Sequence, residues 1–475
     1  MCFIGQPLET NDYYGGGQGH YFGGGSESSN IHPAVLVALC IAGVLILILP
    51  RKQVIYSFVF GSIIIPYYQN IVILGFHFPA LRILIFLGWM RLIASGYLTD
   101  DASPLRRMNN IDKAMLLWVT SNVVMFTILW AQLGALTNQL GFLYTDLGTY
   151  FLLRFLIRDQ DGIERAIKAL AILCFGFGLM MLNEQLTGRN LFGLVGGVPL
   201  EVVMREGKLR SQASFLHPLL AGAFGGTLVT LFVGLWLRRR SARTTAAAGI
   251  IGGTMMAICS MSSTSLIAIV AGVFGLCLWP LRRRMRAVRW SIVTTLITLH
   301  LVMKAPVWAL IARIDLTGGS SGYHRYELID QAIRHFSEWW LVGTKTQSLW
   351  GWDMWDSIDW YVNVATSGGL ITLILFVTVL VHSFKAIGSA RKAAALQRNR
   401  RGELFIWAVG ATLFANVLSF IGICYFDQTI VMWLTFVAII AALRVTPRPD
   451  TIGEVQKEDP TRILRLSEYV SMTYP

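Results

Sequence analysis

The residues best suited to chemistry lie in one hydrophilic stretch at positions 313–360 of the 475-residue chain. Its charged and titratable side chains are His324, Arg325, Asp330, Arg334, His335, Glu338, Asp353, Asp356 and Asp359. Six tryptophans are interleaved with them: Trp339, Trp340, Trp350, Trp352, Trp355 and Trp360. Apolar segments long enough to cross a bilayer flank the stretch on both sides. A long polar loop between such segments usually carries function, so we look for the active residues there.

Within this loop, residues 325–340 show the spacing of an amphipathic helix. The apolar positions recur every three or four residues, at Ile329, Ala332 or Ile333, Phe336 and Trp340. Two opposite-charge pairs four residues apart support the helix, Asp330 with Arg334 and Arg334 with Glu338. Arg325 falls on the apolar stripe and is predicted to point toward the membrane domain, where it either extends to the interface or binds an anion. The tryptophans favour a helix at the membrane interface.

The composition indicates an integral membrane protein, because 54% of the residues are hydrophobic and only 14% are charged. Apolar runs of about 20 residues are the length of a spanning helix. Thirteen candidate spans begin near residues 34, 53, 79, 113, 140, 167, 215, 245, 264, 288, 361, 404 and 426. Twelve is an alternative count, since residues 53–97 are hard to divide. We predict an all-α polytopic fold with about 12–13 transmembrane helices and one large extracytoplasmic loop containing an amphipathic helix.

The net charge of +13 reflects orientation in the membrane rather than nucleic-acid binding. Arg and Lys cluster in alternate short loops, which is the positive-inside pattern. This pattern places residues 187–215 and 313–360 outside the cell membrane. The predicted organisation is a disordered Gly-rich tail at 1–33, a membrane domain at 34–445 and a cytoplasmic tail at 446–475. No nucleotide-binding motif and no metal-ligand spacing of Cys or His is present.

Three stretches of this sequence carry a resemblance to a known family. They are Lys208-Leu-Arg-Ser-Gln-Ala-Ser-Phe-Leu-His-Pro218, Gly322-Tyr-His-Arg325 with the Trp-rich loop through Gly343, and Asp359-Trp-Tyr-Val-Asn363 through Leu370. With its span count, the chain resembles, over residues 34–445, the O-antigen ligase and polymerase superfamily. These are bacterial membrane glycosyltransferases that use lipid-linked glycans. Asp356 stands near the position of the histidine found in the ligases, and the turn Ser260–Ser265 lacks the arginine that often follows it in the family.

The resemblance implies that a sugar leaves undecaprenyl diphosphate and joins an acceptor hydroxyl, on a glycan or a lipid. Guanidinium groups match the charge and geometry of a departing diphosphate, and this role is assigned to Arg210 and Arg325. The acceptor hydroxyl needs a base, for which Asp356 leads, followed by His324. Secondary candidates are His217, His335, Asp146 and Glu184. No cofactor or metal is expected, and the expected location is the bacterial inner membrane.

Most of these candidates also have a structural interpretation. Arg210 could anchor a span at the membrane edge, Asp356 could belong to a solvated turn, and His217 could begin a helix. His335 fits an interfacial position. Glu184 could help to bind the acceptor sugar or could lie among lipid headgroups.

Asp146 and Arg154 lie eight residues apart in one predicted span, with Tyr150 between them. Ionisable groups are costly in lipid, so they are expected either to form a structural pair inside the bundle or to face the substrate.

Two other functions stay open at this point. The chain could be a transporter or flippase of lipid-linked oligosaccharides, although its charges gather in loops and no internal repeat is evident. It could also be a non-catalytic subunit of a polysaccharide export machine, with the Trp-rich loop as a docking surface for other assembly proteins. Release of undecaprenyl diphosphate would distinguish a transferase from both alternatives.

Overall fold

The computed structural model describes residues 29–66, 68–73, 76–96, 104–105, 107–313 and 322–443. The predicted tails lie outside the described residues, apart from residues 29–33. The first seven helices are α1 (Pro33–Ile48), α2 (Arg51–Ile64), α3 (Ala80–Ala94), α4 (Asn110–Trp130), α5 (Leu133–Leu156), α6 (Gln160–Thr187) and α7 (Pro218–Arg238). They are followed by α8 (Arg243–Cys259), α9 (Ser263–Cys277), α10 (Met285–Val302), α11 (Gly322–Arg334), α12 (Phe336–Trp339), α13 (Trp360–Leu396), α14 (Arg400–Ser419) and α15 (Gln428–Ala441).

The prediction of an all-α fold is confirmed for the described part of the chain. Strands occur there only in two antiparallel hairpins, β1 (Asn70–Ile73) with β2 (Phe76–Pro79) and β3 (Val203–Arg205) with β4 (Lys208–Arg210). Thirteen of the described helices have 14 or more residues, and each begins within seven residues of one of the thirteen predicted spans. Apolar runs therefore located the helices correctly.

Several of these helices have the length and composition of membrane spans. Among the described residues five helices qualify, or six when α10 and the 3₁₀ helix Val307–Arg313, which meet at 90°, count as one broken span. Three shorter helices, α1, α9 and α15, are also apolar. The chain is thus a multi-pass membrane protein by helix composition, and the number of 12–13 spans stays a prediction.

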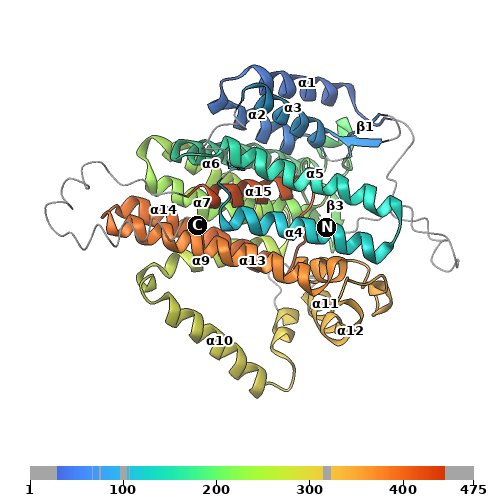
Figure 1. Cartoon of the computed structure of the whole chain (residues 1–475), viewed down its shortest axis with the longest axis vertical. Coiled ribbons are helices and arrows are strands. Elements are labelled where there is room, and N and C mark those ends of the chain that lie inside the picture. The colour runs from blue at the N-terminus through green and yellow to red at the C-terminus, as the bar shows by residue number, and fades with distance from the viewer. Residues whose placement is uncertain are drawn as a thin grey trace.

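The centre of the bundle is formed by helices that are apolar on every side. In α15 the residues from Val431 to Ala441 are all buried, and α7 is buried over most of its length. A helix that is apolar all round must be enclosed by other elements, which explains why α15 runs between α5 and α7 (Figure 1). In contrast, α10 diverges from the bundle and has no buried residue (Figure 1).

An ion pair inside the bundle differs from the sequence prediction. Arg154 on α5 binds Asp112 on α4 through Nε–Oδ1 and Nη2–Oδ2 distances of 2.8 and 3.2 Å, and the Tyr150 hydroxyl donates to the same carboxylate at 2.6 Å. The expected pairing of Arg154 with Asp146 is therefore wrong. Eight residues of helix separate two Cα atoms by about 12 Å, which is too far for their side chains to meet.

The long helix α13 bends at Gly369, which lies in the third stretch that carries the family resemblance. Gly369 has φ 74° and ψ −177° inside the helix. The loop before α13 packs into this bend, because the Leu370 N–H donates to the Trp340 carbonyl at 2.8 Å. A Cβ atom at position 369 would lie 2.5 Å from the Leu341 carbonyl oxygen. Gly369 therefore allows the Trp-rich loop to approach the bundle and does not begin a helix.

Replacing Gly369 by alanine is expected to lower the free energy of unfolding by about 1–3 kcal/mol, because alanine would combine an unfavourable positive φ with a clash against backbone. Gly388→Ala in the same helix is the matched control, since nothing lies within 4 Å of its Cβ position. That control is expected to be neutral or stabilising by about 0.5–1 kcal/mol. Thermal unfolding of both variants in detergent measures the difference, and equal stability would contradict the role given to Gly369.

Candidate functional site

The two polar loops singled out in the sequence lie at the same end of the bundle. The hairpin that begins with β3 and the helices α11 and α12 occupy one end of the bundle (Figure 1). The helices α6 and α8 end beside this hairpin, because Gln185 on α6 donates to the carbonyls of Leu209 in β4 and Cys259 in α8. At the other ends of these helices, basic side chains bind carboxylates or amides, as when Arg239 pairs with Glu164 at 2.8 Å and Arg238 donates to Gln160 at 2.7 Å. The polar loops and this basic end are thus separated by the length of the bundle.

Arg210, the last residue of β4, is buried beneath the first of these loops. Its Nε donates to the Ser260 carbonyl at 3.3 Å, and the next residue, Ser211, donates its N–H to the Cys259 carbonyl at 3.0 Å. Among the residues that the structure describes, no carboxylate forms an ion pair with Arg210. A buried charge is costly unless it is paired, so this arginine is suited to an anionic ligand.

Arg325, in the first turn of α11, is also buried and points inward as predicted. Its Nη2 donates to the Thr264 hydroxyl at 2.8 Å. It shares the buried face of α11 with Leu328 and Ala332. Ala332 belongs to the predicted apolar stripe, but Ile333, Phe336 and Trp340 of that stripe are exposed, and the helix ends at Arg334. The loop after α14 closes over the contact, because a Cβ at Gly422 would lie 3.0 Å from Arg325 Nε and 2.9 Å from Thr264 Oγ1.

Arg210 and Arg325 both contact the turn between α8 and α9. Arg210 contacts Ser260 and Arg325 contacts Thr264, in a segment where five of six residues, Ser260–Ser265, carry hydroxyl groups. The turn is strained, with φ 45° at Met261, and α9 begins at Ser263 without a side-chain cap. The turn thus combines hydroxyl groups and a helix N-terminus with two arginine contacts, and these are groups that proteins use to bind phosphate.

Sequence reasoning treated this turn as a departure from the family, because no arginine follows it. The structure shows that arginines from β4 and α11 contact it instead. The available signal was the run of five hydroxyl residues between two apolar helices, which is unusual where side chains must otherwise be apolar.

Glu184 is held inside the protein by backbone contacts. Its two carboxylate oxygens accept the N–H groups of Gln212 at 2.8 Å and Ala213 at 2.7 Å, and the residue is 1% exposed. This burial does not fit solvation by headgroups, and a contact with the acceptor sugar stays a prediction. The carboxylate holds the backbone that directly follows Arg210, which makes Glu184 a positioning residue.

His217 begins α7, as the structural interpretation of the sequence predicted. Its Nδ1 accepts the Leu219 N–H at 3.1 Å, so this nitrogen carries no proton. His217 is exposed at the surface, and its surroundings still desolvate the imidazole. This desolvation, followed by the charges of Arg210 and Arg205, lowers the pKa of His217 to about 4. His217 is thus a neutral helix cap at neutral pH.

His324 and Asp356, the candidate pair for proton transfer, lie next to each other. His324 Nε2 donates to the main-chain carbonyl of Asp356 at 3.0 Å. Desolvation raises the pKa of the Asp356 carboxyl, and the neighbouring His324 partly opposes this shift while Asp353 adds to it. A half-buried carboxylate with a raised pKa is a candidate for proton transfer.

A further carboxylate that sequence reasoning did not select, Asp359, lies close to Arg325. Its Oδ1 accepts the Val362 N–H at 3.0 Å and caps α13, and the residue is fully buried. Burial raises the pKa of Asp359 to about 7, although two backbone N–H groups and the charge of Arg325 act in the opposite direction. Its capping role fixes the start of α13 against the site.

His335 belongs to the packing of the Trp-rich loop. Its Nδ1 lies 2.7 Å from the Glu338 carboxylate, and its ring stacks on Trp350 with 5.0 Å between centroids. Hydrogen bonds from Trp350, His335 and Thr346 lower the pKa of Glu338 to about 2.

The structure confirms the Asp330–Arg334 pair at 2.6 Å but shows no Arg334–Glu338 pair among these residues, because α11 ends at Arg334 and Glu338 turns to His335.

The tryptophans of this loop divide into two groups. The buried group consists of Trp339, Trp350 and Trp360, and the exposed group consists of Trp340, Trp352 and Trp355. Only the exposed group has the accessibility that the predicted interfacial position requires. The other three are part of the hydrophobic core.

Asp146 is half-buried on α5, and no contact of the described residues connects it with the two arginines. Among the described residues no three His, Cys, Asp or Glu side chains are grouped to hold a metal ion. Metal independence stays a prediction from the resemblance.

Comparison with known proteins finds no family model and no curated protein that matches this chain. The resemblance to O-antigen ligases and polymerases therefore depends on the three sequence stretches and on the site chemistry described above.

Proposed function

We propose that the protein is a glycosyltransferase of the O-antigen ligase and polymerase type, which transfers or polymerises undecaprenyl-diphosphate-linked glycans. The reaction would take place at the extracytoplasmic face of the bacterial cytoplasmic membrane, during assembly of a surface polysaccharide. The observation that carries the proposal is the convergence of Arg210 and Arg325, each 6% exposed, on one hydroxyl-rich turn from two separate loops. Helix formation in this chain does not require two buried arginines at the turn between α8 and α9.

The proposed chemistry uses these cations to stabilise the leaving group. The acceptor oxygen attacks the anomeric carbon, the bond from that carbon to the diphosphate oxygen breaks, and negative charge develops on the diphosphate. Guanidinium groups that are already oriented gain most from this charge, because they need no reorganisation during the reaction. The first N–H groups of α9, beginning at Ser263, would add to the same field.

We assign Asp356 as the base that takes the proton of the acceptor hydroxyl. Its carboxylate accepts no side-chain or backbone hydrogen bond among the described contacts, and it is half-buried beside His324. The Nε2–H of His324 is already used by the carbonyl of Asp356, so we assign His324 an orienting role and Asp356 the role of base.

Replacing Asp356 by asparagine is expected to lower the rate of transfer about 100-fold, because the acceptor hydroxyl loses its base. In the parent protein the rate should fall as pH decreases through the raised pKa of Asp356, where the carboxylate becomes protonated. Asp353→Asn is the matched control from the same turn, and asparagine tolerates its φ of 62°. A pH–rate profile that keeps its acid limb in Asp356→Asn would assign the base to another residue.

The experiment that tests the function is an in-vitro assay of the purified protein with a lipid-linked oligosaccharide and an acceptor glycan. A transferase releases undecaprenyl diphosphate, whereas a flippase or a docking subunit of an export machine does not. In a deletion strain, single repeat units on the carrier lipid would indicate a polymerase, and long chains on it would indicate a ligase.

A further inference from the structure

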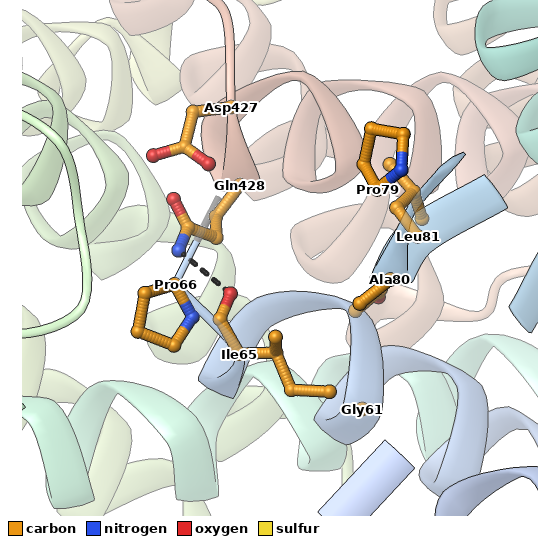
Figure 2. Close-up of a pocket in the computed structure, with 9 residues that line it drawn as sticks. Gly61, Ile65, Pro66, Pro79, Ala80, Leu81, Asp427 and Gln428 are labelled. Carbon is orange, nitrogen blue, oxygen red and sulfur yellow. Dashed lines mark hydrogen bonds between the residues drawn. The ribbon is translucent and has the colours of Figure 1, made fainter. Parts of the chain in front are cut away.

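Asp427, between α14 and α15, contributes to a small cavity outside the site described above. The cavity lies between the end of α2, the start of α3 and the start of α15, and Figure 2 shows most of its lining side chains. Its walls are mostly apolar, formed by Gly61, Ile65, Pro66, Pro79, Ala80 and Leu81. The Ser62 hydroxyl also lines it, and it donates to the Val59 carbonyl at 3.2 Å. Asp427 and Gln428 are its most polar members and are only 5% and 2% exposed.

The hydrogen bonds of these two side chains leave two acceptor atoms without a donor. Asp427 Oδ2 accepts the Leu216 N–H at 3.1 Å, while Oδ1 is buried and has no hydrogen-bond partner among the described residues. Gln428 Nε2 donates to the carbonyls of Ser214 at 2.9 Å and Ile65 at 3.2 Å. Its Oε1 is also buried and lacks a partner within the described chain.

The orientation of the Gln428 amide follows from these contacts. A flipped amide would place its oxygen against two carbonyl oxygens, so the nitrogen must face Ser214 and Ile65. The amide oxygen then lies on the side of the Asp427 carboxylate, as Figure 2 shows. Two acceptors without a donor between them are unfavourable in a buried site, and an ionised carboxylate would make the repulsion stronger.

We propose that Asp427 is a proton-binding site, in which its carboxyl group carries a proton at neutral pH and donates it from Oδ1 to Gln428 Oε1. One proton satisfies both acceptors and removes the buried charge. A sodium ion would need several more oxygen ligands, and beyond Asp427 and Gln428 the side chains that line the cavity offer only the Ser62 hydroxyl.

The electrostatic surroundings agree with this assignment. Burial raises the pKa of Asp427 to about 8, although the N–H groups of Leu216 and Gln428 act in the opposite direction. From the turn after α2, Tyr68 is the titratable group whose pKa the Asp427 charge raises, after the larger effect of burial. From the segment before α7, His217 is neutral near pH 7. On α3, Arg82 donates to Thr145 and to the His77 carbonyl.

The proton on Asp427 would stabilise the position of the segment that follows Arg210. Leu216 binds Asp427 and Ser214 binds Gln428, so both contacts hold residues 211–217 against the start of α15. The backbone of Asp427 is itself strained, with φ 57° and ψ −142°, which shows that tertiary contacts impose its position. Loss of the proton would place a charge beside Gln428 Oε1 and loosen this segment.

The raised pKa of Asp427 determines how the stability of the native state changes with pH. The native state holds the proton more tightly than the unfolded state, whose aspartates titrate near about 3.9. The stabilisation is therefore complete below about pH 4 and is lost as pH rises through about 8. This is opposite to the behaviour of an aspartate held in an ion pair.

The test uses the full-length protein in detergent and needs no glycan substrate, so it is independent of the proposed function. In Asp427→Asn, Nδ2 can donate to Gln428 Oε1 and Oδ1 can still accept the Leu216 N–H. We expect its melting temperature to equal that of the parent protein near pH 5, and the parent to lose several degrees relative to it between about pH 5 and pH 9. The infrared absorption of protonated carboxyl groups at pH 7 should decrease by the contribution of one group in this variant and stay unchanged in Asp353→Asn.

Other outcomes would overturn the proposal. If Asp427→Asn melts several degrees lower than the parent protein at every pH and the carboxyl band is unchanged, then Asp427 is ionised and a water molecule bridges the oxygens. If the parent protein is stabilised by sodium but not by choline, and Asp427→Asn is not, the cavity binds a cation. A failure of the transferase assay alone would leave the infrared and melting results unaffected.

Discussion

Replacing Arg210 or Arg325 by alanine should lower the rate of undecaprenyl diphosphate release about 100- to 1,000-fold, because each removes one preoriented donor to the departing diphosphate. The double variant should have no measurable transfer. Arg210→Ala should not lower the amount of protein in the membrane greatly, since the Arg210 side chain makes one hydrogen bond to the protein, to Ser260, and no ion pair within the described residues. The assay is release of carrier lipid by purified protein, with immunoblotting of membranes for protein level.

Matched variants make this prediction specific. Arg205→Ala changes an exposed arginine of the same hairpin and should leave transfer near the parental rate. Arg210→Lys should restore little activity, because an ammonium group does not reproduce the bidentate geometry of a guanidinium. Parental transfer by both single alanine variants would remove the diphosphate site. The same conclusion would follow if impermeant thiol reagents labelled the Arg210→Cys and Arg325→Cys variants only from the cytoplasmic side.

Replacing Asp112 by alanine should be the most destabilising single change among those considered. The Arg154 guanidinium binds both oxygens of Asp112 inside the bundle, and Tyr150 donates to the same carboxylate. Removal of the acid leaves a buried positive charge without its counterion, at an expected cost of about 3–5 kcal/mol. Unfolding in detergent measures this loss, and the variant should also accumulate to a lower level in membranes.

Two controls distinguish the cost of an unpaired buried charge from a general loss of packing. In the double variant Asp112→Leu with Arg154→Met both charges are replaced by apolar groups of similar volume, and most of the lost stability should return. Asp161→Ala removes an exposed carboxylate that lies 4.0 Å from Arg239, and should cost less than about 1 kcal/mol. A double variant that is as unstable as Asp112→Ala would show that shape, and not the unpaired charge, is responsible.

The interactions behind these effects could be predicted from the sequence to different degrees. Arg325 could be placed correctly, because its position on the apolar stripe of a helix decides which way it points. The start of α7 at His217-Pro218 and the thirteen long helices were also predictable, since capping residues and apolar runs act over neighbouring residues. The break after Arg334 was missed, and with it the loss of the Arg334–Glu338 pair.

A helical, multi-pass membrane protein with two polar loops that contain arginines can be predicted from the sequence alone. The pairing of Asp112 with Arg154, the contact of Glu184 with the backbone after Arg210, and the approach of two arginines to the turn Ser260–Ser265 become visible only in the folded chain. Helix formation and burial depend on local periodicity, which the sequence contains. The pairing of side chains from different helices depends on how those helices pack, and many partners are compatible with the same apolar pattern.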